Sequence, residues 1–479
     1  MSGSDTLRHR MVSGLLAGLL GGWVYGSFGS PHPWFGPAHH LFLNAGIGIG
    51  FGLFLGKLVT TAGSGLLWGE AYALIWWIVG PLTFFPFLLG NPPGWTVEAA
   101  RSAFPMLLGY LVGYGTVLGL VYSYLSALFA GSWRARVLRQ LTADFLFAVA
   151  IGGVAGLVGG LAFGAWMERV GIFPLIAGLV RSESADVGRT LHFIISVVIG
   201  ASYGVLFRGD IQGIGSSIAW GLAYGFTWWV LGPLTIMPLW LGLGVQWSLA
   251  AGQAAFPSLV GHLIYGTLLG LVYSAVDRLW RVLFVESDPL KREPEGPGTR
   301  SLRAVGMGIL ASLAGGLAFT VVMVKTDALP VVASLIGRSS PTTGFVVHMV
   351  ISAIIGATYG LLFRREAYTY GAGLAWGLVY GLVWWFLGPL TLMPILLGAE
   401  VQWSLASALG AYPSLIGHLA YGSATALAYQ LLVMRYDPAL RKGSRSVRTH
   451  LRRTSGTPAA ALWVVVLMLG LMLPLLLTD

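Results

Sequence analysis

The stretch that decides the fold is WGLAYGFTWWVLGPLTIMP, which runs from Trp220 to Pro238. A close copy, WGLVYGLVWWFLGPLTLMP, begins 156 residues later at Trp376, and a third version, WGEAYALIWWIVGPLTFFP, begins 152 residues earlier at Trp68. Similarity at such intervals indicates a fold built from copies of one unit. Each version starts as an apolar run typical of a membrane-spanning helix and ends near a Gly-Pro pair, which disfavours helix.

The similarity continues on both sides of this stretch. Upstream, HFIISVVIGASYGVLF from His192 matches HMVISAIIGATYGLLF from His348, and HLFLNAGIGIGFGLFL from His40 is a diverged version. Downstream, GHLIYGTLLGLVYS from Gly261 matches GHLAYGSATALAYQ from Gly417. The corresponding stretch of the first copy, GYLVGYGTVLGLVYS, is one residue longer.

These matches predict an all-α polytopic membrane protein with three tandem four-helix repeats and one C-terminal transmembrane helix. The expected boundaries are 11–130, 141–284 and 301–435 for the repeats (segments 1, 2 and 3), 436–457 for a basic cytoplasmic linker and 458–477 for the last helix. Thirteen apolar runs are long enough to span a bilayer. They lie near 11–29, 41–59, 63–81, 104–127, 144–167, 190–207, 213–232, 257–276, 304–324, 345–363, 370–388, 413–434 and 458–477.

The composition supports this class. Of 479 residues, 56% are hydrophobic and 10% charged, and the mean hydropathy is +0.77, whereas soluble domains carry about 25% charged residues. A soluble enzyme is excluded. The 69 glycines show no Gly-X-Y period, which excludes collagen and fits helices that pack closely in lipid. Without cysteine there are no disulfides, thiolate metal sites or iron–sulfur clusters.

The basic residues predict an orientation. With a cytoplasmic N-terminus, the inner loops and tails hold 22 of the 28 Lys and Arg residues, as the positive-inside rule requires. We therefore expect the cytoplasmic (inner) membrane, with the C-terminus outside. The net charge of +10 then reflects topology, so the expected partner is the lipid bilayer and not nucleic acid. Because each segment has an even number of spans, the copies are parallel, which favours a pseudo-threefold ring about the membrane normal.

Histidines recur on two spans of each segment. The second span of segment 2 carries His192 and Ser196 on one stripe, segment 3 repeats them as His348 and Ser352, and segment 1 has His40 and Asn44. The fourth span starts with His262 or His418, and with Tyr110 in segment 1.

Three interpretations of these histidines stay open. They are neutral imidazoles bonded to a neighbouring helix or facing head groups, or groups of a proton or ion pathway. Alternatively, His192, His262, His348 and His418 are ligands of a haem or another metal cofactor.

The Gly-Pro-Leu-Thr element predicts that the third span breaks near Gly80, Gly232 and Gly388. The apolar residues after it form either an outer segment that dips into the membrane and lines a cavity, or a capped interfacial elbow. Thr83, Thr235 and Thr391 are the residues that could satisfy the freed carbonyls or line the cavity.

Two further features concern the outer face and the membrane interior. FPLIAGLVRS from Phe173 and LPVVASLIGRSS from Leu329 predict short interfacial helices. They make the outer face apolar, either as lids over a vestibule or as a docking surface for protein partners. Inside the membrane, Glu70 is the one clear acidic candidate, and Leu222 and Leu378 replace it in the other segments.

The elements His-x-x-x-Ser followed by Gly-x-x-Tyr (His192 to Tyr203) and Gly-His-Leu-x-Tyr (Gly261 to Tyr265) resemble bacterial multi-spanning proteins of the YagU-like type. One segment corresponds to one such protein. The resemblance covers these short motifs only, and the Gly-Pro-Leu-Thr element is not placed by it. It implies an inner-membrane location and an association with acid resistance.

The leading functional hypothesis is a conduit or transporter for a small solute or ion, either passive or proton-linked. One alternative is a non-catalytic membrane subunit of a respiratory or photosynthetic assembly, which binds haem, metal or pigment through the histidines. Another is a structural scaffold that docks partner subunits on its outer face. We do not expect an enzyme, because the sequence contains no nucleophile–base pair or paired-carboxylate set.

Overall fold

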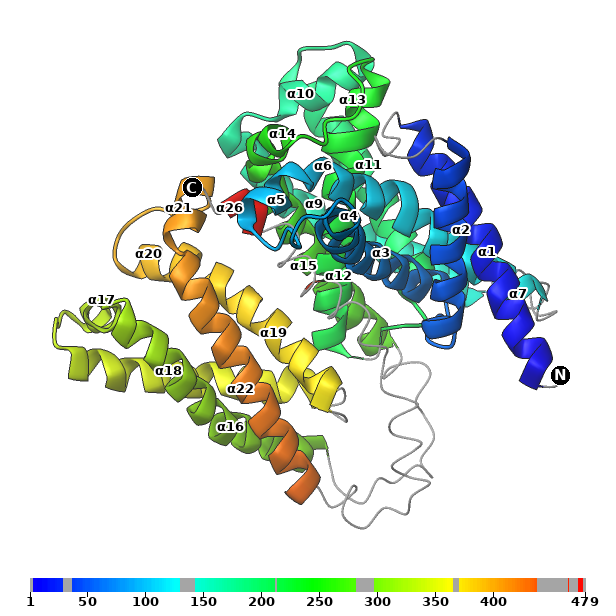
Figure 1. The fold of residues 1–479 in the computed structure, drawn as a ribbon. Coiled ribbons are helices and arrows are strands. Elements are labelled where there is room, and N and C mark those ends of the chain that lie inside the picture. The colour runs from blue at the N-terminus through cyan, green and yellow to red at the C-terminus, as the bar shows by residue number, and fades with distance from the viewer. Residues whose placement is uncertain are drawn as a thin grey trace. The chain divides into compact units, whose positions relative to one another are not determined.

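The computed structural model describes residues 3–28, 37–129, 143–211, 213–280, 297–364, 370–436, 464 and 473–476. All regular elements in this part of the chain are helices (Figure 1). The chain forms two compact units. One contains residues 1–211, 220–273 and 462–479, and the other contains 212–219 and 274–461.

Segment 1 lies in the first unit. Its elements are α1 (Gly3–Ser27), α2 (Pro37–Phe54), α3 (Ala62–Val79), η1 (Gly80–Phe84), α4 (Phe85–Leu88), α5 (Val97–Ser102), α6 (Phe104–Leu108), η2 (Gly109–Gly115) and α7 (Thr116–Phe129). Helix α1 packs against α2 and α7, and α3 packs against α7 and η2. A short terminal helix, α26 (Leu473–Leu476), contacts α5 in the same unit.

Segment 2 differs in having two short helical elements between its first and second spans and an undivided fourth span. Its elements are α9 (Ala143–Val170), α10 (Phe173–Ala177), η3 (Gly178–Val180), α11 (Ala185–Phe207), α12 (Ile214–Leu231), η4 (Gly232–Ile236), α13 (Met237–Trp240), α14 (Leu249–Ala254) and α15 (Phe256–Trp280). Helix α9 packs along α11, and the short helix α10 lies on α11.

Segment 3 lies in the second unit. Its elements are α16 (Pro297–Lys325), α17 (Leu329–Ala333), η6 (Ser334–Ile336), α18 (Pro341–Phe363), α19 (Tyr370–Leu387), η7 (Gly388–Leu392), α20 (Met393–Leu396), α21 (Leu405–Gly410) and α22 (Tyr412–Tyr436). Helix α16 packs against α18 and α22, and α19 packs against α22. The short helices expected after the first span of segments 2 and 3 are present as α10 and α17.

Within the described residues, nine helices are long and apolar enough to cross a membrane. They correspond to the nine predicted spans from 63–81 to 370–388, so the protein is a polytopic α-helical membrane protein. The predicted spans 11–29, 41–59 and 413–434 form α1, α2 and α22, which are helical but not among the nine. The predicted span 458–477 lies outside the described residues except for 464 and 473–476.

The expected helix break at the Gly-Pro pairs is wrong. The third spans continue without interruption over Ala62–Leu88, Ile214–Trp240 and Tyr370–Leu396, each 27 residues long. The five residues from each Gly-Pro adopt a π-helical turn, as η1, η4 and η7. A π-turn bonds residue i to i+5, and here the N–H groups of Phe85, Met237 and Met393 donate to the carbonyls of Gly80, Gly232 and Gly388.

The extra residue of segment 1 also forms a π-turn. Element η2 covers Gly109–Gly115, the stretch that is one residue longer than its counterparts. The equivalent parts of segments 2 and 3 belong to the continuous α-helices α15 and α22. A single inserted residue in a helix is accommodated as a π-bulge, and such bulges are frequent at functional sites.

Glycine allows the first and second spans of each segment to approach closely. A Cβ atom on Gly152 of α9 would clash with the carbonyl oxygen of Gly200 on α11. In segment 3, Gly308 of α16 has the same relation to Gly356 of α18. Backbone-to-backbone packing of this kind replaces the hydrophobic effect as the source of helix association in lipid.

We expect Gly152→Ala to destabilise the protein by about 1–3 kcal/mol, because α9 and α11 must separate to admit the methyl group. The neighbouring variant Gly153→Ala is the matched control, since a Cβ there would lie 3.5 Å from the nearest side-chain atom, on Val197. Thermal unfolding in detergent measures both. Equal melting temperatures for the two variants would contradict the packing described here.

Candidate functional site

The predicted threonines hold the elbows, which we define as residues 80–103, 232–255 and 388–411. The Thr83 hydroxyl donates to the Ile78 carbonyl at 2.8 Å and accepts the Trp95 indole N–H at 2.9 Å. The same pair of bonds occurs at the other two threonines, as Trp247–Thr235–Val230 and Trp403–Thr391–Phe386, with the same two distances.

Backbone bonds close each elbow onto its π-turn. The amide of Gly94 donates to the Leu82 carbonyl at 2.7 Å, and Gln246 and Gln402 do the same to Leu234 and Leu390. Because the hydroxyls and carbonyls are paired with each other, the elbows are capped structures. Of the two alternatives that the sequence left open, the described contacts favour the capped elbow.

The histidines of the second spans bond to the first spans. The Nε2 of His192 lies 2.9 Å from the Gly160 carbonyl, and the Nε2 of His348 lies 3.0 Å from the Gly316 carbonyl. A carbonyl only accepts, so Nε2 carries the proton in both rings. His40 differs, because its Nε2 lies 3.1 Å from the amide nitrogen of Asn44, which is the donor.

The histidines of the fourth spans bond to their own helices. The Nδ1 of His262 lies 2.8 Å from the Ser258 carbonyl, and the Nδ1 of His418 lies 2.8 Å from the Ser414 carbonyl. Each ring therefore donates its Nδ1 proton to the preceding turn.

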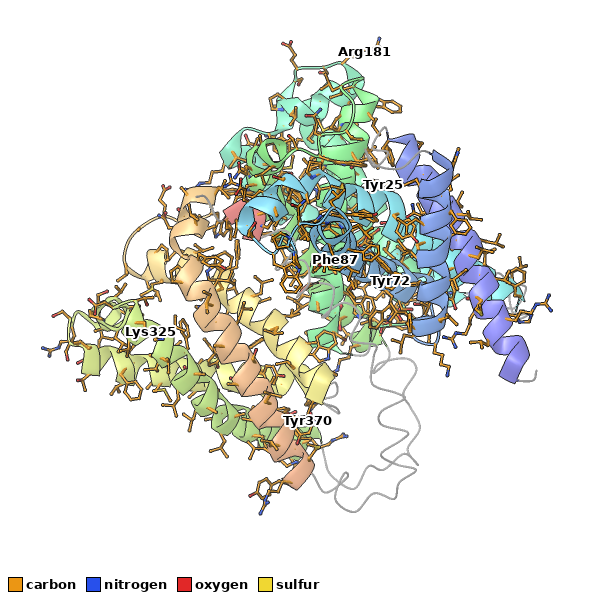
Figure 2. The ribbon with its side chains drawn as sticks, in the orientation of Figure 1. Tyr25, Tyr72, Phe87, Arg181, Lys325 and Tyr370 are labelled. Atoms are coloured by element: carbon orange, nitrogen blue, oxygen red, sulfur yellow. The ribbon has the colours of Figure 1, made fainter. Side chains whose placement is uncertain are left out.

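An aromatic ring lies between the two histidines of a segment. Phe163 is in contact with both His192 and His262, at centroid distances of 5.2 and 4.9 Å. Phe319 is placed in the same way between His348 and His418. In segment 1, Tyr25 (labelled in Figure 2) contacts His40 and Tyr110. The histidine pairs thus converge on a hydrocarbon ring.

The described residues hold no group of three or more His, Asp or Glu side chains suited to a metal ion. The predicted haem or metal role of His192, His262, His348 and His418 therefore gains no support from the part of the chain that the structure describes.

The middle residues of the stripe form helix contacts. Asn44, Ser196 and Ser352 are buried. Their backbone carbonyls accept the hydroxyls of Tyr114, Tyr265 and Tyr421 on the fourth spans, at 2.7–2.9 Å. These tyrosines tie the second span to the fourth at one equivalent position of each segment.

Glu70 occupies a different kind of site. Its side chain is only 1% exposed and lies about two turns into α3. One carboxyl oxygen, Oε1, accepts the hydroxyl of Thr116 from α7, and the other, Oε2, accepts that of Thr227 from α12, both at 2.9 Å. The carboxyl group therefore connects segments 1 and 2 inside the first unit.

Both hydroxyls have an alternative acceptor. Thr116 Oγ1 lies 3.2 Å from the Leu111 carbonyl, inside the π-turn η2, and Thr227 Oγ1 lies 3.0 Å from the Ala223 carbonyl. When Glu70 is ionised, the hydroxyls donate to it. When it is protonated, it can donate to one hydroxyl, which then donates to its backbone carbonyl.

Sequence reasoning missed the two threonines. Thr227 replaces Ile75 and Val383 of the other segments, just as Glu70 replaces Leu222 and Leu378. The available signal was that the third spans of segments 1 and 2 each carry a polar residue where the other segments have an apolar one. Thr116 gave no such signal, because the equivalent residues are also hydroxylic.

A second buried acid, Asp210, was also missed. It lies between α11 and α12, is 3% exposed, and accepts the hydroxyl of Thr61, the N-cap residue of α3. Burial raises the pKa of the Asp210 carboxyl to about 7, although its bonds from Thr61 and the Ser64 backbone act in the opposite direction. Segment 2 thus contacts helix α3 at two places, the N-cap of the helix and Glu70.

Comparison with models of protein families, with curated proteins and with solved structures finds no match. The resemblance to YagU-like proteins stays a prediction.

We expect Thr391→Val to destabilise the protein by about 1–3 kcal/mol, because the Trp403 N–H and the Phe386 carbonyl lose their shared partner. Thr391→Ser retains the hydroxyl and is the control. Thermal unfolding in detergent compares them, and a valine variant as stable as the serine variant would show that the elbow does not need this hydroxyl.

The pKa of Asp210 predicts how stability depends on pH. Between its ordinary value of 3.8 and about 7, folded Asp210 retains a proton that the unfolded chain releases, so the free energy of unfolding falls as pH rises through this range and is level above it. Asp210→Asn should remove this slope, whereas Asp186→Asn, an exposed acid at the start of α11, should not. Melting temperatures measured from pH 4 to pH 8 provide the test.

Proposed function

We propose that the protein is a proton-linked conduit of the cytoplasmic membrane for a small solute or ion, in which Glu70 takes up and releases the proton. The observation that carries this proposal is the contact of both Glu70 oxygens with hydroxyls that have a second acceptor. Ionised and neutral Glu70 both find partners, so neither state leaves an unpaired polar group at membrane depth. An acid that is buried and paired in this way within a span is a functional site by default.

The proposal includes three parallel copies of one four-helix unit about a pseudo-threefold axis, with the N-terminus in the cytoplasm. Equivalent contacts support it. A Cβ on Gly63 of α3 would press on Leu206 and Phe207, in the first unit. A Cβ on Gly215 would press on Leu362 and Phe363, in the second unit. The start of α3 meets segment 2, and the start of α12 meets segment 3, through the same surfaces. This is the head-to-tail relation that a ring uses.

A scaffold is the second candidate, and exposed apolar residues on the elbows favour it. Phe87, Trp95, Trp240 and Leu396 are each 70–73% exposed. Aromatic residues at such positions suit a membrane interface or a partner subunit. A role in binding haem, metal or pigment is supported less, because a phenylalanine ring contacts both histidines of each pair in segments 2 and 3.

Proton flux into vesicles tests the conduit. The purified chain is reconstituted in phosphatidylcholine–phosphatidylglycerol vesicles that contain a pH-sensitive dye, and a potassium diffusion potential drives protons inward. We expect Glu70→Gln to reduce the flux at least about a hundredfold, because an amide cannot exchange a proton with the threonines. Glu70→Leu, which installs the residue found in segments 2 and 3, should have the same effect.

Controls separate loss of function from loss of fold. Glu98→Gln changes an exposed acid of α5 and should leave the flux unaltered. Melting temperatures show whether each variant is folded, and the leucine variant covers the case in which the glutamine variant is not. Flux equal to that of empty vesicles, or flux that persists in both Glu70 variants, would contradict the conduit and leave the scaffold as the better proposal.

A further inference from the structure

Among the described residues, the buried acids are Glu70 and Asp210. Both lie where helix α3 of segment 1 meets segment 2, one at the N-cap Thr61 and the other facing Thr227. Eight residues separate the start of α3 from Glu70, which corresponds to about 12 Å along the helix. The two carboxyl groups therefore lie along the same helix, Asp210 at its N-terminal end and Glu70 nearer its middle.

Asp210 lies at the end of α3 that is nearest to water. It falls outside the spans, between Ala185–Phe207 and Ile214–Trp240, and the adjacent Gly209 is exposed. The groups that face its carboxyl are the Thr61 hydroxyl and the Ser64 backbone N–H, both from α3. Asp210 forms no ion pair with any described side chain, so no fixed charge holds it in one protonation state.

A polar group on α12 lies between Asp210 and Thr227 in the order of the chain. The indole N–H of Trp220 is fully buried and has no acceptor among the described residues. Trp220 and Thr227 are seven residues apart and hence lie on one face of α12. A buried N–H needs an acceptor, and water is the small acceptor that also conducts protons. Trp376 of segment 3 has the same unpaired N–H, so the acids and not the indole distinguish this interface.

We infer that Asp210 is a second proton-binding group, which passes protons between water at the start of α3 and Glu70. The inference rests on the proposed function. With the N-terminus in the cytoplasm, the start of α3 lies on the cytoplasmic side, so proton transfer from Asp210 to Glu70 is part of outward movement. Neutral Asp210 releases its proton and becomes a carboxylate, and the Glu70 carboxylate accepts that proton and becomes neutral. Water then protonates Asp210 again. Because burial raises the pKa of Asp210 to about 7, both of its states are populated near neutral pH.

The test is the pH dependence of flux in the vesicle assay, with protons as the probe. We expect Asp210→Asn to lower the flux by about tenfold or more and to flatten its pH dependence between about pH 6 and 8, because the amide still accepts the bond from Thr61 but cannot titrate. Asp210→Glu should restore both the rate and the pH profile. Asp186→Asn is the control for loss of an exposed acid, at the opposite end of α11, and should behave as the unmodified protein.

The outcomes separate the two proposals. If Glu70→Gln abolishes flux but Asp210→Asn leaves the rate and the pH profile unchanged, the inference is overturned and the conduit stands. If Asp210→Asn lowers the flux and Asp210→Glu does not restore it, Asp210 acts through the cap of α3 and the inference is again overturned. If the unmodified protein conducts no protons, the proposed function fails and this inference fails with it.

Discussion

In a bilayer, every backbone N–H and C=O must find a partner inside the protein, because the hydrocarbon offers none. This constraint explains how three prolines are tolerated within third spans. At each Gly-Pro pair the backbone adopts a π-turn, in which the glycine carbonyl accepts the N–H of the fifth residue after it. A threonine hydroxyl then donates to the carbonyl five residues earlier and accepts the indole N–H of a tryptophan. The Gly-Pro-Leu-Thr element thus lets the helix continue past a proline.

The same constraint makes the polar groups near α3 informative. A buried carboxyl group in a span is costly unless its oxygens are bonded, and both oxygens of Glu70 are bonded to threonines of different helices. Asp210 is bonded to the cap of the same helix. The histidines are also buried and bonded, but to the backbone and around phenylalanine rings. Burial alone therefore does not distinguish an active group from a structural one, whereas alternative partners do.

The sequence predicted the helical class and the third to eleventh spans, because long apolar runs are a strong signal. It also predicted that Thr83 and its equivalents could satisfy freed carbonyls. It wrongly predicted a helix break at the Gly-Pro pairs. Proline disfavours a helix through its own ring and missing N–H, whereas the π-turn is accompanied by bonds from a threonine hydroxyl and a tryptophan indole farther along the chain. Glu70 was identified from its place in a span, but Thr227 and Asp210 were not. Their roles depend on which helices adjoin, and a single sequence does not contain that information.

Linking similar segments in one polypeptide allows the extra residue of η2 to occur at a single place. An insertion in a symmetric trimer of separate identical chains would appear three times, and so would an acid beside it. Here the bulge, Glu70 and Thr116 occur in segment 1 alone as a set, with leucines at the positions equivalent to Glu70. Covalent fusion thus permits an acid to occur in one segment without appearing in the other two.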